Sequence, residues 1–132
     1  MNIQELSTIL QYRLPVKVFI LNNEYMGMVR QWQELLHGGR YSESYMESLP
    51  DFVKLAEAFG STGLRCTDPD KVDDCIKEMI SIKGPVVVDM IIDKTENVFP
   101  MVPSGAAHNE MLLGDETDDG GPKVTSDGLS LV

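Results

Sequence analysis

The chain has 132 residues, a formal net charge of −10 and a hydrophobic content of 42%. This length fits one domain or part of a larger one, and the hydrophobic content is sufficient for a folded core. The negative charge argues against a nucleic-acid-binding surface, which needs basic residues to contact phosphates, and against attraction to anionic membranes. No apolar run approaches the roughly 20 residues of a membrane span and no signal peptide is recognisable, so we expect a cytoplasmic protein.

The cysteines and histidines do not predict a metal site. Cys66 and Cys75 do not form a Cys-x-x-Cys pair, and His37 and His108 are far apart in the sequence. Zinc sites usually bring such ligands together at short spacings. We therefore expect reduced, partly buried thiols.

The first third of the chain predicts a helix, a strand and a second helix. Apolar residues recur at helical spacing across residues 2–11. Residues 16–21 form an apolar run rich in β-branched residues, typical of a strand buried on both faces, and the run stops at Asn22 and Asn23. After a short turn, an apolar stripe predicts a second helix that ends at paired glycines; its residues are Met28, Val29, Trp32, Leu35 and Leu36.

The middle of the chain repeats this alternation after a polar loop at residues 40–49. The spacing of apolar and capping residues predicts a helix with Pro50 in its first turn, a short strand at 62–66, a helix opened by Asp68 and Pro69, and a buried strand at 86–92. This order is the βαβ arrangement of an α/β protein, with a partial parallel sheet flanked by helices.

The last part of the chain changes character. Residues 95–104 contain two prolines and no hydrophobic period, and residues 106–113 could form one short helix. From residue 114 onward the sequence is rich in glycine and aspartate. We expect a domain over residues 1–113 and an acidic, disordered tail over residues 114–132.

The end of the first strand is the most informative place in the sequence. In open parallel sheets, ligands bind at the carboxyl ends of strands, next to helix N-termini. The amide side chains of Asn22 and Asn23 could serve an oxygen-seeking cation and an anionic ligand there. Taken alone, the pair is more typical of a plain strand-end turn. Met28 and Trp32, four residues apart on one helix face, are by themselves more typical of a core.

Several stretches closely resemble the catalytic subunits of the acetohydroxyacid synthase (acetolactate synthase) family. They include LNNEYMGMVRQW at residues 21–32, PDFVKLAEAFG at 50–60 and FPMVPSGA at 99–106. The resemblance covers roughly residues 1–112 in order and without a large gap. It implies the C-terminal part of a thiamine-diphosphate-binding domain of the α/β class.

The resemblance implies thiamine diphosphate and Mg²⁺ as cofactors. Asn23 would give the metal a side-chain oxygen and Tyr25 a backbone carbonyl, and Mg²⁺ prefers such oxygen ligands. The helix start at Met26, Gly27 and Met28 would lie against the diphosphate, where Gly27 permits close approach of the backbone.

The resemblance also assigns Met28, Trp32 and Ser104 to a channel that admits substrates and herbicidal inhibitors. An aromatic ring and a flexible thioether suit an apolar pocket that accepts more than one side chain. The alternative for Ser104 is a plain turn residue. No catalytic residue is expected here, because the family's catalytic glutamate belongs to a domain that this sequence does not match.

The family motif for the diphosphate begins with Gly-Asp-Gly, which this sequence lacks, as it lacks counterparts of the pyrimidine-binding domain and of the domain that binds FAD. We therefore expect a C-terminal fragment that is inactive by itself. The implied reaction of the full-length enzyme is condensation of pyruvate with a second 2-oxo acid, pyruvate or 2-oxobutyrate, with loss of CO₂, in branched-chain amino-acid biosynthesis.

The implied partners are a second catalytic subunit, in a homodimer or larger assembly, and a small regulatory subunit; nucleic acid and membranes are not expected. Two alternatives remain at this point. One is a fragment of a sister thiamine-diphosphate-dependent carboligase, decarboxylase or oxidase. The other is a non-catalytic binding domain of the same fold.

Overall fold

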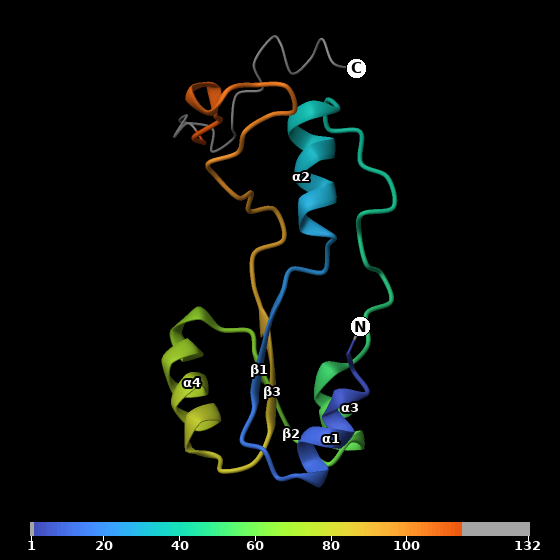
Figure 1. Cartoon of the computed structure of the whole chain (residues 1–132), viewed down its shortest axis with the longest axis vertical. Coiled ribbons are helices and arrows are strands. Elements are labelled where there is room, and N and C mark those ends of the chain that lie inside the picture. Colours follow the sequence, from blue (N-terminus) through green and yellow to red (C-terminus); the bar gives the residue numbers. More distant parts are fainter. Residues whose placement is uncertain (1, 115–132) are drawn as a thin grey trace. The chain divides into compact units, whose positions relative to one another are not determined.

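The computed structural model describes residues 2–114 of the chain (Figure 1). These residues form two compact units: unit 1 holds residues 2–23 and 48–93, and unit 2 holds residues 24–47 and 94–114. The domain limit expected at residue 113 stays a prediction. The tail expected to be disordered lies, from residue 115 onward, outside the described residues.

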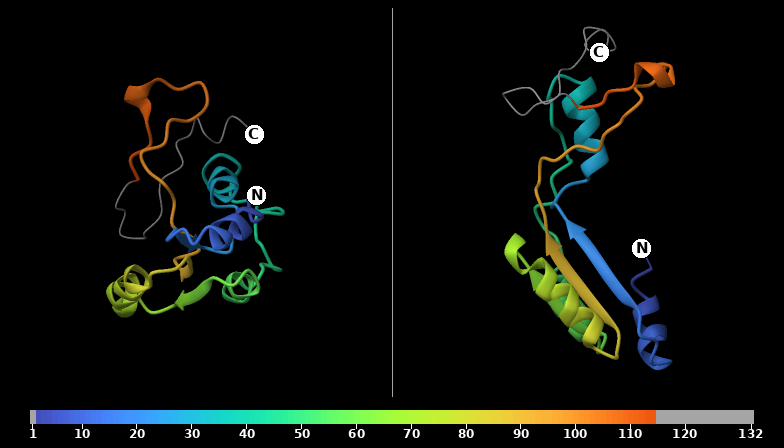
Figure 2. Two further views of the ribbon diagram at one scale, coloured as in Figure 1. Left: turned by 60° about the horizontal axis from the view of Figure 1, so that its bottom comes forward. Right: turned by 90° about the vertical axis from the view of Figure 1, so that its left-hand side faces the viewer.

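Unit 1 is a parallel α/β sheet, as the sequence predicts. Its strands are β1 (Lys17–Asn22), β2 (Thr62–Cys66) and β3 (Val86–Ile91), in the order β1-β3-β2. The central strand β3 is paired with β1 from Lys17↔Val86 to Asn22↔Ile91 and with β2 from Thr62↔Val86 to Cys66↔Met90. Helix α4 (Val72–Ser81) packs on one face of the sheet, and helices α1 (Glu5–Gln11) and α3 (Phe52–Ala58) pack on the other (Figures 1 and 2).

The core of unit 1 is built around β3, because successive side chains of a strand point to opposite faces. Val86, Val88 and Met90 pack against α4 through Val72, Cys75 and Met79. On the other face, Val87 packs with Leu6 of α1 and Ala56 of α3. Helix α3 lies so close to β2 that a Cβ atom on Gly63 would lie 2.7 Å from the carbonyl oxygen of Val53, so glycine is required there.

Strand β1 differs from the expected strand buried on both faces. Val18 and Ile20 pack toward α1 and α3, but Phe19 is 37% exposed and Leu21 is 62% exposed. The reason is that β1 is an edge strand of the described sheet, and α4 packs against residues of β2 and β3. An apolar run predicts two-sided burial only where helices cover both faces.

Several helix boundaries also differ from the prediction. Helix α1 begins at Glu5, not near residue 2. Helix α3 is capped by the Asp51 carboxylate, which accepts from the Val53 and Lys54 N–H groups at 3.2 and 3.3 Å, so Pro50 precedes the cap instead of lying in the first turn. The remaining differences are a 3₁₀ turn, η1 (Pro69–Lys71), before α4 and, in place of a helix over 106–113, a second 3₁₀ turn, η2 (His108–Glu110).

A buried polar network joins the strands of unit 1. Asp89 of β3 is 2% exposed; its Oδ1 accepts from Asn22 Nδ2 at 2.9 Å, and its Oδ2 accepts from Arg65 Nε at 3.0 Å. Arg65 also donates to Asp51 Oδ1 at 2.8 Å. A carboxylate buried in a sheet needs such partners. The network therefore fixes the end of β1, which immediately precedes Asn23.

Unit 2 contains helix α2 (Gly27–Leu36) and two segments without long regular elements. Gly38 and Gly39 follow α2 with φ angles of +60° and +69°, the left-handed conformation that ends a helix, as the paired glycines predict. Met101 and Leu112 form an antiparallel bridge through N–H···O bonds of 2.9 and 2.7 Å. Within residues 2–114, no helix is both long and apolar enough to cross a membrane.

Candidate functional site

The expected cofactor residues occupy the connection between β1 and α2. β1 ends at Asn22 and α2 begins at Gly27, with Asn23 and Tyr25, both half-buried, between them. Asn23 is the last residue of its stretch of unit 1, and Tyr25 belongs to unit 2. The position at a strand end before a helix agrees with the motif, and the metal-ligand roles stay predictions.

Backbone pairing shapes the connection on its unit 2 side. Met26 N–H donates to the Ser44 carbonyl at 2.8 Å, and Met46 N–H donates to the Glu24 carbonyl at 2.8 Å. Glu24 itself has φ +58°, which is uncommon for a residue with a side chain and marks a sharp turn. The loop after α2 therefore holds the entry to α2 in one conformation.

Charges reinforce this turn. Lys94 Nζ donates to Glu24 Oε2, and this hydrogen bond lowers the pKa of Glu24 and raises the pKa of Lys94. Tyr45 also donates to Glu24 at 3.2 Å, and its ring lies 5.1 Å from the Tyr25 ring. The first residues of the two unit 2 segments are thus tied together.

Helix α2 is covered on its polar side and uncovered along part of its apolar stripe. Arg30 and Gln31 are 8% and 2% exposed, whereas Met28 and Trp32 are 53% and 42% exposed. Only the C-terminal end of the predicted stripe, Leu35 and Leu36, is buried. The alternative of a core position, which the spacing alone suggested for Met28 and Trp32, is therefore not what the described residues show. The helical spacing predicts correctly that these residues share one face of α2. The local sequence does not indicate whether another part of the protein covers that face.

The buried polar side of α2 is stabilised by specific partners. Arg30 Nη1 pairs with Glu34 Oε2 at 2.6 Å and donates to the Thr95 carbonyl at 3.2 Å. Its guanidinium lies 5.4 Å from the centre of the Tyr25 ring and 5.0 Å from that of Tyr41. Burial and the nearby Glu34 charge raise the pKa of Tyr41. A buried charge needs such compensation.

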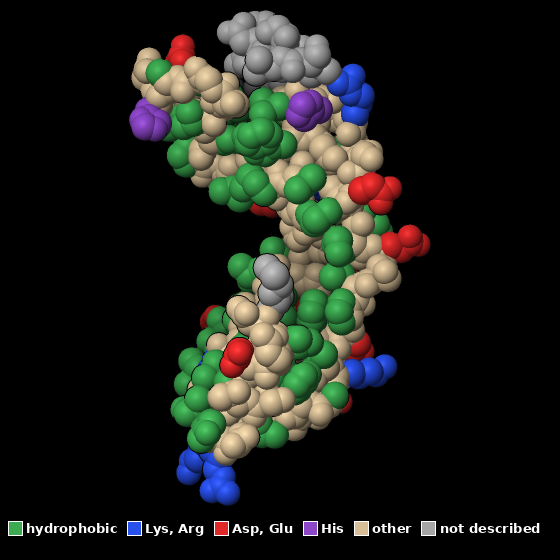
Figure 3. Space-filling model, turned by 45° about the vertical axis from the view of Figure 1, so that its right-hand side comes forward, with side chains coloured by type: hydrophobic (Ala, Val, Ile, Leu, Met, Phe, Trp, Pro, Cys, Tyr) green, Lys and Arg blue, Asp and Glu red, His purple; other side chains and the backbone are tan. Residues whose placement is uncertain are grey.

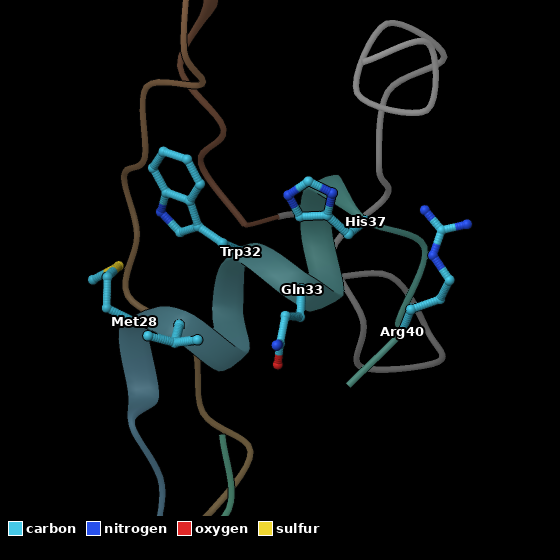
Figure 4. A pocket seen from close by; sticks show the side chains of 6 residues that line it. Met28, Trp32, Gln33, His37 and Arg40 are labelled. Carbon is cyan, nitrogen blue, oxygen red and sulfur yellow. The ribbon is translucent and has the colours of Figure 1, made fainter. Parts of the chain in front are cut away.

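The uncovered stripe lines an open groove of about 570 Å³ (Figure 4). Its apolar end is Met28, Val29 and Trp32, and its polar end is Gln33, His37 and Arg40. Hydrophobic side chains gather near a histidine on the surface of this unit (Figure 3). Large exposed apolar side chains in one groove are typical of a binding surface.

The groove has an unused acceptor at its polar end. Gln33 Nε2 donates to the Ser42 carbonyl at 2.7 Å, while Gln33 Oε1 is buried and has no hydrogen-bond partner among the described residues. A ligand or water with an N–H or O–H group would satisfy that oxygen.

Two of the three expected channel residues, Met28 and Trp32, line this groove together. The third, Ser104, is exposed in a turn and is not among the described residues that line it. Sequence reasoning missed Arg30, Gln31 and Asp89. The signal for the first two was present, because a polar pair interrupts the apolar residues of the GMVRQW motif.

The residue types in the connection between β1 and α2 are compatible with the expected cofactors. The amide oxygen of Asn23 and the carbonyl of Tyr25 are hard oxygen donors of the kind that Mg²⁺ accepts. Helix α2 has no side-chain cap from Met26 at its N-terminus, where N–H groups and the helix dipole favour a phosphate group. Among residues 2–114 no group of three His, Cys, Asp or Glu side chains could hold a metal ion by itself. The residues present fit as the neutral half of such a site.

Known proteins resemble this chain in both sequence and fold. The chain is 51% identical over 114 residues to the acetolactate synthase large subunit of Haemophilus influenzae and 49% identical over 116 residues to the acetolactate synthase isozyme 3 large subunit of Escherichia coli. Each match covers 86% of this chain, but the chain spans only 20% of the length of either relative.

A thiamine diphosphate-dependent 4-hydroxybenzoylformate decarboxylase of Rhodococcus jostii RHA1 has a similar structure, with a TM-score of 0.61 and 25% identity over 73% of this chain and 18% of that one. Residues 1–90 match the family described as "Thiamine pyrophosphate enzyme, C-terminal TPP binding domain". The chain therefore belongs to the thiamine pyrophosphate enzyme family, through the domain that binds this cofactor.

Proposed function

We propose that this chain is the C-terminal part of an acetolactate synthase large subunit. The full-length enzyme would condense pyruvate with a second 2-oxo acid, pyruvate or 2-oxobutyrate, with loss of CO₂, on the route to valine, leucine and isoleucine. The observation that carries the proposal is the 51% identity to an acetolactate synthase large subunit over 86% of the chain.

In this proposal the chain binds and orients, and bound thiamine diphosphate supplies the carbon nucleophile. Asn23 and Tyr25 hold the Mg²⁺ ion through their oxygens. The N–H groups at Gly27 and Met28 hold the diphosphate. The apolar end of the groove, at Met28 and Trp32, would bind the alkyl group of the incoming 2-oxo acid.

The proposal includes further components that lie beyond the described chain. Mg²⁺ accompanies thiamine diphosphate, and FAD belongs to a separate domain of the longer protein. A second catalytic subunit completes the site, and a small subunit regulates it. The expected cytoplasmic location stays a prediction.

The structural likeness to a decarboxylase supports a second candidate. A sister decarboxylase with the same cofactor would release an aldehyde and would need no binding surface for a second 2-oxo acid. The exposed apolar groove of α2 favours the carboligase, since a second organic substrate needs a surface on which to bind.

A chimeric enzyme tests the choice. Residues 1–114 replace the matching C-terminal segment of the E. coli isozyme 3 large subunit, and the products formed from pyruvate are identified by mass spectrometry. The proposal predicts acetolactate. A chimera that melts like the parent enzyme but releases acetaldehyde would favour the decarboxylase, and one that forms neither product would refute both. The same chimera with Asn23→Ala provides the control for cofactor dependence.

A further inference from the structure

Gln31 is nearly inaccessible, with 2% of its surface exposed, yet it carries a side-chain amide. Its Oε1 accepts from the Val98 N–H at 2.7 Å, and its Nε2 donates to the Val98 carbonyl at 2.9 Å. The same nitrogen lies 3.1 Å from Met101 Sδ. Because the backbone of Val98 presents one donor and one acceptor, this pairing also fixes which way the Gln31 amide is turned.

The segment that Gln31 contacts through these hydrogen bonds has no regular structure of its own. Residues 94–100 contain no helix or strand, so their backbone groups depend on partners elsewhere. Two neighbouring contacts also come from α2: Arg30 donates to the Thr95 carbonyl at 3.2 Å, and Glu34 accepts from Asn97 Nδ2 at 3.1 Å. Of these three contacts, only Gln31 pairs with both backbone groups of one residue.

These contacts lie on the opposite side of α2 from the groove. Met28 and Trp32 project from the exposed side of the helix, and Gln31 projects from its buried side. The hydrogen bonds between Gln31 and Val98 therefore set the position of residues 95–101 relative to the helix that carries Trp32. They also constrain the chain that continues to Ser104.

We propose that Gln31 is a positioning residue of the substrate channel, holding the 95–101 segment against α2 through the backbone of Val98. The inference rests on the proposed function, because it concerns the channel of that enzyme. Gln31 touches no substrate. Its loss lets the segment shift against Trp32, which weakens capture of the second 2-oxo acid and leaves the preceding chemistry intact.

The first test measures how strongly the hydrogen bonds of Gln31 protect Val98 in the 132-residue chain. Gln31→Met keeps the length and packing of the side chain but removes both hydrogen bonds. Hydrogen exchange at the Val98 amide, followed by NMR, should accelerate by about tenfold or more. Gln31→Glu, with an ionised carboxylate, keeps the bond from Val98 N–H and loses the one to the Val98 carbonyl, so its effect should be intermediate. An unchanged Val98 exchange rate in Gln31→Met would overturn the inference.

The second test measures how the hydrogen bonds between Gln31 and Val98 affect substrate binding in the chimeric enzyme. With pyruvate as the donor and 2-oxobutyrate as the varied acceptor, Gln31→Met should raise KM by about tenfold while kcat changes by less than about threefold, a split that marks lost binding. Leu35→Ala provides the matched control, because it destabilises the same helix but removes neither hydrogen bond between Gln31 and Val98: the melting temperature should fall and KM should stay unchanged.

The outcomes separate the two proposals. A parent chimera that forms no acetolactate refutes the proposed function and the channel role together. Hydrogen exchange at the Val98 amide still decides whether Gln31 holds the backbone of Val98. An active parent chimera in which Gln31→Met and Leu35→Ala give the same kinetic profile would show that Gln31 acts only through stability, and would overturn the positioning role.

Discussion

Two alanine substitutions test whether the apolar stripe of α2 is covered at one end only. Leu35 and Met28 lie on the same stripe, two helical turns apart, and both are unbranched at Cβ. Leu35 is 1% exposed and Met28 is 53% exposed. Alanine has the highest helix propensity, so neither Leu35→Ala nor Met28→Ala should disturb the helix itself.

The expected magnitudes differ because the two side chains differ in burial. Leu35→Ala removes a fully buried side chain and leaves a cavity, which costs about 2–5 kcal/mol. Met28→Ala removes a side chain that already keeps half of its surface in water and leaves no closed cavity, so about 1 kcal/mol or less is expected. Leu35→Ala is therefore predicted to cost at least about 1 kcal/mol more than Met28→Ala.

Urea unfolding of the 132-residue chain measures both values. Circular dichroism follows the helices, and the fluorescence of Trp32, the sole tryptophan of the chain, follows α2 itself; coincident transitions would support two-state analysis. Equal losses of stability in the two variants would refute the reasoning, because they would place Met28 in a core that the structure does not show.

Three further predictions concern the metal, the sheet network and the isolated chain. In the chimeric enzyme, Asn23→Ala should raise the half-saturating concentrations of Mg²⁺ and thiamine diphosphate with little change in melting temperature, and unchanged half-saturation would remove Asn23 from the site. The N–H of Lys54 and the charge of Arg65 hold the pKa of Asp51 below its ordinary value, so this stabilisation is present above the unfolded-state pKa and is lost as pH falls through the folded-state pKa. Asp51→Asn keeps a capping side chain but not the charge, and should therefore flatten the acid side of a plot of urea midpoint against pH; an identical plot would disprove a role for the charge. The 132-residue chain alone should form no acetolactate from pyruvate with both cofactors present, and turnover above that of free thiamine diphosphate would contradict this.

The strands of unit 1 were predictable because their signals are local. β3 is a continuous run of apolar residues, and β2 is bounded by Gly60 and Asp68, so both were placed within one residue. The burial of β1 was not predictable, because it depends on what covers the strand at Phe19 and Leu21. An apolar run records that a strand is suited to burial, not that its neighbours are present in the same chain.

The site was predictable in its motif but not in its support. Asn23 and Trp32 follow from the resemblance, and the helical spacing around Trp32 is plain in the sequence. The buried roles of Gln31 and Asp89 depend on partners 67 residues away along the chain, at Val98 and Asn22 respectively. Local periodicity does not identify such partners, and it treats a buried polar residue as part of a solvated face.

The most direct measurement of the central claim is made on Trp32, the aromatic residue of the uncovered stripe. In the chimeric enzyme, Trp32→Leu should retain acetolactate formation and the melting temperature of the parent, while a herbicidal inhibitor that blocks the parent should no longer inhibit. That result would place the exposed face of α2 on the substrate path. A variant that melts at a markedly lower temperature and remains sensitive to the inhibitor would show instead that Trp32 is a core residue of the intact enzyme, and would contradict the account.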